Sequence, residues 1–122
     1  MSNRPDSKGR ILVVDDDQGG LEALSDILEY EGYTVERAQN GLQALDHLQK
    51  SRPLPNLIIL DLLMPVMDGW EFRTRQKEDP ALAEVPVLVI TAISAIAGID
   101  AAEILHKPID VDALLRAVAR HC

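Results

Sequence analysis

Five short runs of apolar or β-branched residues alternate with helical patterns along this chain, and this alternation restricts its fold more than any other feature. Pro, Gly or Asp bounds each run, as is usual for strands. The runs are RILVV (10–14), YTVERA (33–38), NLIIL (56–60), VPVLVI (85–90) and EILH (103–106). A strand–helix pair repeated five times predicts an α/β protein whose parallel sheet is covered by helices on both faces.

The segments between the runs carry apolar residues at helical spacing, so each predicts a helix with one buried face. We expect Asp68 and Asp110 to cap helix N-termini and Gly32 to follow the end of the first helix. Asp17 is predicted to cap or precede the first helix, with a metal role as the alternative. The apolar sets are Leu21, Leu24, Ile27 and Leu28; then Leu42, Leu45 and Leu48; and then Leu114, Leu115 and Val118.

The composition of the runs also predicts the strand order. ILVV, LIIL and VLVI are apolar without alternation, as in central parallel strands, whereas YTVERA alternates as an edge strand would. We therefore predict a flavodoxin-like, doubly wound, five-stranded parallel sheet of order 2-1-3-4-5, with the connectivity (βα)5. Residues 10–122 would form this one domain, and residues 1–9 would be a flexible N-terminal lead-in.

One connection is shorter than the pattern requires. Only the eleven residues AISAIAGIDAA separate Thr91 from Glu103, whereas a parallel crossover usually takes a dozen or more. We therefore predict that the fourth helix is short or irregular, since a helix advances only about 1.5 Å per residue.

Composition excludes several classes of protein. The chain has 122 residues and its apolar runs fall far short of the roughly 20 residues that span a bilayer. The N-terminus lacks a secretory apolar segment. The single cysteine, Cys122, excludes an intramolecular disulfide, which fits a cytoplasmic location. A net charge of -8 with dispersed Lys and Arg argues against nucleic-acid binding.

Polar residues follow four of the predicted strands. In an open α/β sheet, ligands bind outside the carboxyl ends of the strands, where the strand order reverses. Asp15 and Asp16 follow the first strand, Asp61 the third, Thr91 the fourth and Lys107 the fifth. Carboxylates about 4 Å apart repel by about 4 kcal/mol at an effective dielectric of 20. One lysine does not offset three acids, and oxygen ligands favour Mg²⁺, so these residues suit phosphoryl transfer with a carboxylate nucleophile.

The motifs VVDDD, LDLLMPVMDG, VITA and HKP occur in this order, and the chain resembles the receiver domains of two-component response regulators over residues 10 to about 121. The aspartate motif D-x-x-M-P-x-M-D-G is the most specific of them. The resemblance implies that Asp61 accepts a phosphoryl group from a sensor histidine kinase, a phosphotransfer protein or a small phosphodonor. The other implied ligands are Asp15, Asp16, Asp61 and the Leu63 carbonyl for Mg²⁺ (Mn²⁺ is possible), and Thr91, the Ala92 N–H and Lys107 for the phosphoryl group.

The resemblance also implies a cis peptide bond between Lys107 and Pro108, and it highlights two departures from the family. The family usually carries Tyr or Phe where this chain has Ile104, so the signal would travel by backbone and loop rearrangement. The shortened crossover belongs to a face that many receivers use to dimerise, so we expect a monomer.

Leu63 and Ile93 are apolar at positions that influence how water reaches the acyl phosphate in this family. Because neither side chain can orient water, we predict slow self-hydrolysis of the phosphoryl group.

Three functions fit these residues to different degrees. The first is a phosphorylation-dependent signalling switch that catalyses only its own phosphorylation and dephosphorylation and acts through an unidentified protein target. The second is a pseudo-receiver, an interaction scaffold without phosphorylation. The third is a Mg²⁺-dependent phosphatase of the haloacid-dehalogenase type, but Leu63 stands where its second Asp would be. The chain ends soon after HKP, which predicts a stand-alone receiver, with a piece of a longer protein as the alternative. We expect no nucleic-acid or membrane partner and take no histidine as a metal ligand.

Overall fold

The structure is a computed structural model that describes residues 7–50, 52–96 and 98–122. Five parallel strands form one sheet in the order 2-1-3-4-5, which confirms the predicted flavodoxin-like topology with β2 at one edge and β5 at the other. The strands are β1 (Arg10–Val14), β2 (Thr34–Ala38), β3 (Leu57–Asp61), β4 (Val87–Thr91) and β5 (Glu103–His106).

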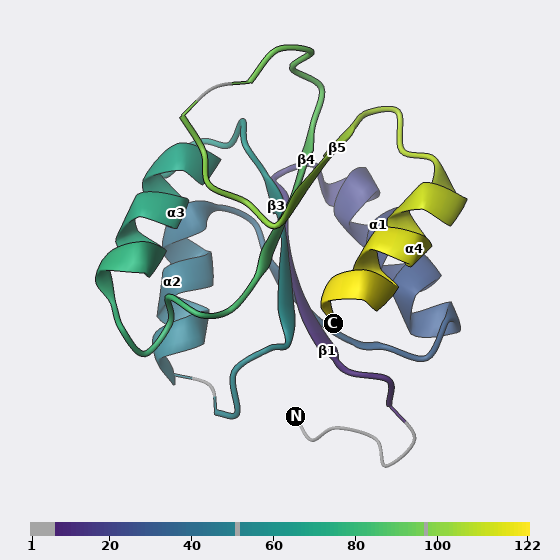
Figure 1. Ribbon diagram of the computed structural model, residues 1–122, viewed down its shortest axis with the longest axis horizontal. Coiled ribbons are helices and arrows are strands. Elements are labelled where there is room, and N and C mark those ends of the chain that lie inside the picture. Colours follow the sequence, from purple (N-terminus) through teal and green to yellow (C-terminus); the bar gives the residue numbers. More distant parts are fainter. Residues whose placement is uncertain (1–6, 51, 97) are drawn as a thin grey trace.

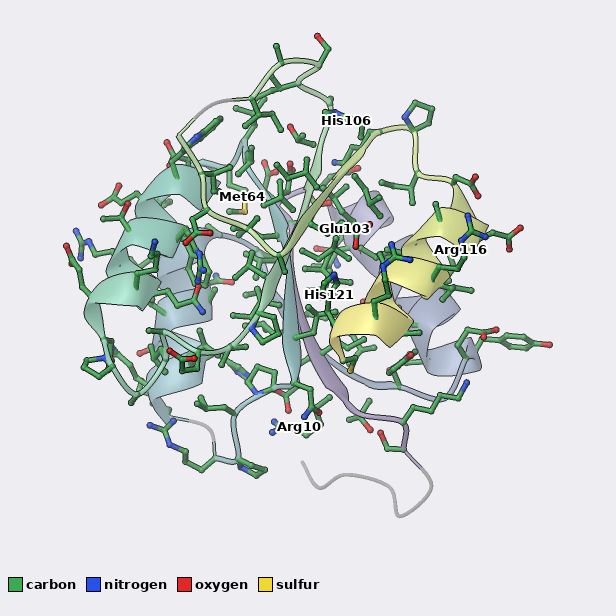
Figure 2. All side chains as sticks on the ribbon, in the orientation of Figure 1. Arg10, Met64, Glu103, His106, Arg116 and His121 are labelled. Atoms are coloured by element: carbon green, nitrogen blue, oxygen red, sulfur yellow. The ribbon has the colours of Figure 1, made fainter. Side chains whose placement is uncertain are left out.

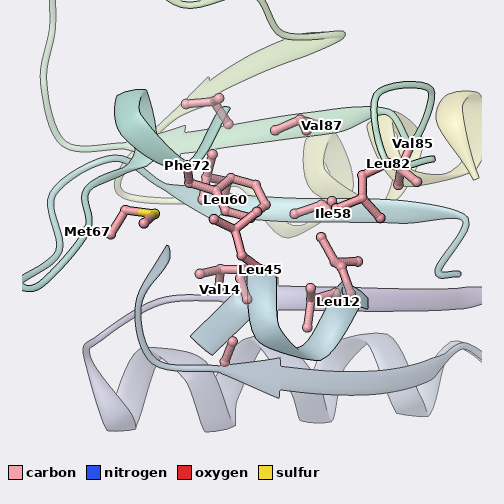
Figure 3. Packing of buried hydrophobic residues seen from close by; sticks show 14 of the residues in the cluster. Leu12, Val14, Leu45, Ile58, Leu60, Met67, Phe72, Leu82, Val85 and Val87 are labelled. Carbon is pink, nitrogen blue, oxygen red and sulfur yellow. The ribbon is translucent and has the colours of Figure 1, made fainter. Parts of the chain in front are cut away.

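Two helices cover each face of the sheet. Figure 1 shows α2 and α3 on one side of the strands and α1 and α4 on the other. The helices are α1 (Gln18–Tyr30), α2 (Gly41–Lys50), α3 (Gly69–Glu78) and α4 (Val111–His121). Successive strand residues alternate between the two layers, as the pleat requires. Leu12, Val14, Ile58 and Leu60 pack with α2 and α3 (Figure 3), whereas Ile11, Val13, Leu57 and Ile59 pack with α1 and α4.

The predicted buried face of α2 was wrong at Leu42, whose side chain is 52% exposed. The buried residues of α2 are Gly41, Ala44, Leu45 and Leu48, which have the spacing of one helix face. Gly41 fixes this orientation, because its N–H donates to the Met67 carbonyl at 3.0 Å. A Cβ at position 41 would lie 2.8 Å from the same carbonyl oxygen, so the close approach requires glycine.

We predicted a short or irregular fourth helix between β4 and β5. The connection is irregular, but its described residues 92–96 and 98–102 contain no helical turn, so the predicted helix is not found there. This segment instead runs past α3 on its way to β5 (Figure 1). Ile96 and Ile99 pack against the core on the α2–α3 side. The Arg73 Nε donates to the Asp100 carbonyl at 2.7 Å, and the Lys77 Nζ lies 2.7 Å from the Asp100 carboxylate. Eleven residues must return along the whole sheet, and an extended path covers that distance where a helix would shorten it.

The predicted helix ends are mostly found. The Asp68 side chain accepts a hydrogen bond from the Glu71 N–H, and the Asp110 side chain accepts from two N–H groups of α4. Asp17 stands at the N-cap of α1, but its side chain makes no capping hydrogen bond. Gly32 follows the end of α1 with a φ of 104°.

Residues 7–9 of the predicted lead-in lie beside the start of β2. The Lys8 N–H donates to the Gly32 carbonyl and the Thr34 N–H to the Gly9 carbonyl, each at 2.9 Å. Residues 1–6 lie outside the described residues. In the part of the chain that is described, no helix has the length and apolar character needed to cross a bilayer.

Candidate functional site

The carboxyl ends of β1, β3, β4 and β5 bring the predicted site residues to one edge of the sheet. Asp15 and Asp61 are largely buried, at 6% and 9% exposed, and Thr91 is fully buried. One carboxylate oxygen from each of Asp15, Asp16 and Asp61 lies within 4.8 Å of the other two. Buried apolar strands therefore place three acids where their charges must be compensated.

Lys107 contributes the positive charge beside this cluster. Its Nζ lies 3.7 Å from the Asp15 Oδ2 and 3.6 Å from the Asp61 Oδ2. The Lys107–Pro108 peptide bond is cis, as expected from the resemblance. One ammonium thus stands between two of the three carboxylates, and the set keeps a surplus of negative charge.

The pKa of Asp61 reflects first its burial and then the neighbouring charges. Burial is the largest influence, and together with the Asp15 carboxylate it raises the pKa of Asp61 to about 6, while Lys107 and a hydrogen bond from the Leu63 backbone act in the opposite direction. A divalent cation among the acids would favour the ionised, nucleophilic form of Asp61.

The donor set fits Mg²⁺. Carboxylate oxygens are hard ligands, and no nitrogen or sulfur ligand belongs to this three-residue cluster. Asp16 is exposed and so leaves one side of the cluster open to solvent, which suits an ion that keeps several of its waters.

Thr91 lies at the end of β4 and is held by backbone contacts. Its hydroxyl oxygen accepts a hydrogen bond from the Ile93 N–H at 3.0 Å, and its carbonyl accepts from the Lys107 N–H at 2.8 Å. Ala92 is exposed between Thr91 and Ile93. The β4 end therefore offers a hydroxyl and an accessible loop next to the acids.

Two features were not predicted from the sequence. A groove of about 290 Å³ lies between α1 and the start of α4; it is mostly apolar, and Asp15 and Lys107 also line it. Leu24 and Ile27, which we expected only to pack in the core, line this groove. The second feature is His106, whose ring lies against the β4–β5 connection. Neither could be read from spacing, since both depend on how segments distant in the sequence meet.

Comparison with known proteins agrees with this geometry. The family model of the response regulator receiver domain matches residues 11–119. Response regulator MprA of Mycobacterium sp. (strain KMS) is 40% identical over 114 residues, which are 87% of this chain and 47% of that protein. The chain thus spans about half the length of this relative.

Solved structures show the same likeness. The receiver domain of a signal transduction histidine kinase from Syntrophus aciditrophicus superposes with a TM-score of 0.84 at 36% identity, over 92% of this chain and 88% of that one. The response regulator TrrA from Thermotoga maritima, solved in complex with Mg²⁺-BeF, has a TM-score of 0.82 at 30% identity, over 93% and 98% of the two chains. This chain belongs to the response regulator receiver domain family of two-component signalling.

Proposed function

We propose that this receiver is a Mg²⁺-dependent phosphorylation switch whose acceptor is Asp61 and whose donor is the phosphohistidine of a sensor histidine kinase or phosphotransfer protein. The observation that carries the proposal is the position of the Asp61 carboxylate, within a cluster of three acids and 3.6 Å from the Lys107 ammonium. An acid that only began a loop would not require two further acids and a lysine close to its carboxylate.

The reaction is a transfer between two nucleophiles. A carboxylate oxygen of Asp61 attacks the phosphorus, an O–P bond forms, the P–N bond of the donor breaks, and the donor imidazole keeps the electron pair and takes up a proton. Lys107 balances charge on the transferred group, and the Thr91 hydroxyl and the Ala92 N–H provide hydrogen bonds to its oxygens. Asp61 must be ionised to attack, so its pKa of about 6 suits neutral pH.

Asp15, Asp16 and Asp61, with the Leu63 carbonyl, would hold the Mg²⁺. When bound, the ion supplies positive charge that stabilises the phosphoryl oxygens. Mn²⁺ prefers similar oxygen ligands and would substitute for it. The solved complex of TrrA with Mg²⁺-BeF supports this assignment, since that protein shares the fold over nearly its whole length.

The groove between α1 and α4 supports a protein as donor. Leu24, Ile27 and Ile109 line it directly beside Asp15 and Lys107. An apolar surface next to a charged site suits a partner that buries a side chain there while presenting its phosphohistidine. Because phosphohistidine is made from ATP by the kinase, we place the receiver in the cytoplasm.

The test is incubation with acetyl phosphate and Mg²⁺, followed by intact-mass measurement of the wild type and Asp61→Asn. We expect one stable phosphoryl group on the wild type and none on the variant. Continuous release of phosphate without a stable adduct would favour the phosphatase. No adduct on the wild type, with or without a histidine kinase, would favour the pseudo-receiver.

The apolar side chain of Leu63 leads us to predict a long lifetime for the phosphoryl group. Its side chain is 56% exposed and apolar, so it offers no polar group that could orient an attacking water. Leu63→Asn is expected to shorten the half-life about tenfold or more, since an amide can position water. Val66→Asn is the matched control, because it adds the same group to another exposed apolar position of this loop. A wild-type half-life of seconds would contradict the prediction.

We also propose that the receiver stays monomeric when phosphorylated. The support is the irregular β4–β5 connection, because its described residues 92–96 and 98–102 form no helix that could join β5 and α4 in a helix-mediated dimer face. The molar mass in solution, measured with and without acetyl phosphate, tests this. A dimer that forms only on phosphorylation, packed through β5 and α4, would refute it.

A further inference from the structure

Three hydrogen bonds join the ends of β4 and β5 in a closed ring. Thr91 and His106 are register partners in the parallel ladder. The Thr91 carbonyl accepts from the Lys107 N–H at 2.8 Å, and the Thr91 hydroxyl oxygen accepts from the Ile93 N–H at 3.0 Å. The ring closes where the His106 Nδ1 lies 3.0 Å from the Ile93 carbonyl oxygen. Since a carbonyl oxygen only accepts, the Nδ1 of His106 must carry the hydrogen.

The ring has a buried end and an exposed end. Thr91 is fully buried beside the acids, whereas His106 is exposed. Figure 2 shows His106 at the upper end of the sheet, opposite Arg10 at the lower end, and therefore at the same end as the acceptor site. The ring is thus a continuous bonded path from the phosphoryl site to the surface.

We propose that His106 is a positioning residue for signalling. A change in the hydrogen bonding of Thr91 is transmitted through Ile93 to His106, which lies on the outer surface of β5. The inference rests on the proposed function, because it requires a phosphoryl group at Asp61 to change what the Thr91 hydroxyl binds.

The coupling follows from the hydrogen bonds available to Thr91. When the Thr91 side chain rotates about its Cα–Cβ bond to bring the hydroxyl to a phosphoryl oxygen, Oγ1 moves, and the Ile93 N–H either follows it or loses its acceptor. The N–H and the C=O of Ile93 flank one Cα, so a shift of this residue moves the carbonyl that His106 binds. The His106 ring then changes its hydrogen bond or its rotamer.

Ile104 does not provide this path. In a parallel ladder, register partners point to the same side of the sheet, so Ile104 and His106 share the face of Val89 and Thr91. Ile104 is 36% exposed and its side chain has no hydrogen-bonding group. The polar side chain on this face of β5 is His106, and its contact is to the residue two positions after Thr91.

The first measurement is the NMR signal of the imidazole nitrogens, with and without Mg²⁺ and beryllium fluoride or acetyl phosphate. The chain has three histidines. We expect the Nδ1–H form of His106 to be lost or strongly shifted on phosphorylation. His47 is the internal control, because it lies on α2 and binds Glu36. An unchanged His106 signal in a phosphorylated protein would overturn the inference and leave the proposed function intact.

The second measurement is hydrogen exchange of the peptide that contains residues 92–96, because the Ile93 N–H belongs to the ring. Phosphorylation of the wild type should change its exchange about fivefold, the effect of one hydrogen bond made or lost. His106→Ala should still be phosphorylated, but its loop should exchange alike in both states. His106→Asn should restore the response, because its amide nitrogen stands near the Nδ1 position.

These experiments distinguish failure of the proposed phosphorylation function from failure of the inference about His106. If the wild type takes no phosphoryl group, the proposed function fails and the inference fails with it. If His106→Ala is phosphorylated and its loop still responds as the wild type does, only the inference is overturned. Loss of folding in His106→Ala would be visible in the phosphorylation yield, and the Asn variant then decides the question.

Discussion

Two connections leave the functional site, and they are built in opposite ways (Figure 1). Residues 62–86 connect β3 to β4 through α3, which inserts the fully buried Phe72 into the core. Residues 92–102 connect β4 to β5 without a helix in their described part, and exposed Asp100 holds them to α3. The first connection begins at Asp61 and the second at Thr91.

This difference places the phosphoryl acceptor, Asp61, on one connection and the segment that would change on phosphorylation on the other. Asp61 lies on a strand whose following helix is anchored in the core, so its position is rigid. Thr91 precedes a segment held by exposed ion pairs and by the only partly buried Ile96 and Ile99, and such a segment opens at lower free energy. A switch needs both properties, since the chemistry requires fixed geometry and the signal requires a segment that changes.

The largest effect should come from the anchor of the helical connection. Phe72→Ala is expected to destabilise the protein by about 3–5 kcal/mol, because it removes a fully buried ring. Ile99→Ala, in the irregular connection, removes a partly buried side chain and should cost about 1 kcal/mol. Urea unfolding of both variants measures the difference. Equal losses would show that the two connections are anchored alike.

The next largest effect is the change in stability with pH that Asp61 causes at the end of β3. The pKa of Asp61 is raised from 3.8 to about 6 in the folded protein, so the folded state holds the proton more tightly than the unfolded state. Without a divalent cation, stability should therefore fall as the pH rises from about 4 to about 6, and level off above. After solvent screening is allowed for, the loss is on the order of 2 kcal/mol.

Asp61→Asn is the control for this pH dependence. It cannot ionise, so its stability should lack this decline and exceed that of the wild type at pH 7 when Mg²⁺ is absent. Urea unfolding at several pH values checks both statements. A wild type that gains stability between pH 4 and pH 6, with the variant flat, would contradict the raised pKa.

Much of this architecture was predictable because local patterns and burial agree. Unbroken apolar runs such as LIIL belong to central strands, and parallel strand ends meet at one edge, so Asp15, Asp61 and Lys107 could be brought together from spacing alone. Leu42 was misplaced because the orientation of α2 depends on the contact of Gly41 with Met67, which lies in another segment.

The irregular connection is a second case in which the sequence did not predict the structure. Its length indicated a shortened helix, but its path along α3 depends on Asp100 meeting Arg73 and Lys77, more than twenty residues earlier in the chain. The contact of His106 with Ile93 likewise depends on the β4–β5 register. A tertiary contact of this kind leaves no periodic pattern in the sequence.

Buried hydrogen bonds in the helical connection should contribute more to stability than hydrogen bonds on the surface. The Nε2 of Gln76 is buried and donates to the Leu82 and Val85 carbonyls, each at 3.0 Å. Gln76→Met keeps the volume but leaves both carbonyls without this donor, which should cost about 2 kcal/mol. Gln43→Met, on the exposed side of α2, should cost under about 0.5 kcal/mol. Similar unfolding midpoints for the two variants would refute the role of Gln76.

The smallest global effect should come from Asp100→Asn in the irregular connection. Lys77, and after it Arg73, hold the pKa of Asp100 below its usual value. The contribution of this carboxylate is therefore present at neutral pH and is lost as the pH falls through its lowered pKa. Because the carboxylate is exposed, water and salt screen the ion pairs. We expect the urea midpoint to stay unchanged while hydrogen exchange in residues 98–102 becomes faster.

Two controls make the result specific to the connection. Asp26→Asn removes the same charge from the exposed side of α1 and should leave exchange in residues 98–102 unchanged. High salt should speed this exchange in the wild type and have less effect in Asp100→Asn, because the variant has already lost the screened ion pairs. If Asp100→Asn instead lowers the urea midpoint as far as Phe72→Ala does, the irregular connection is part of the rigid core, and the separation of acceptor from response is wrong.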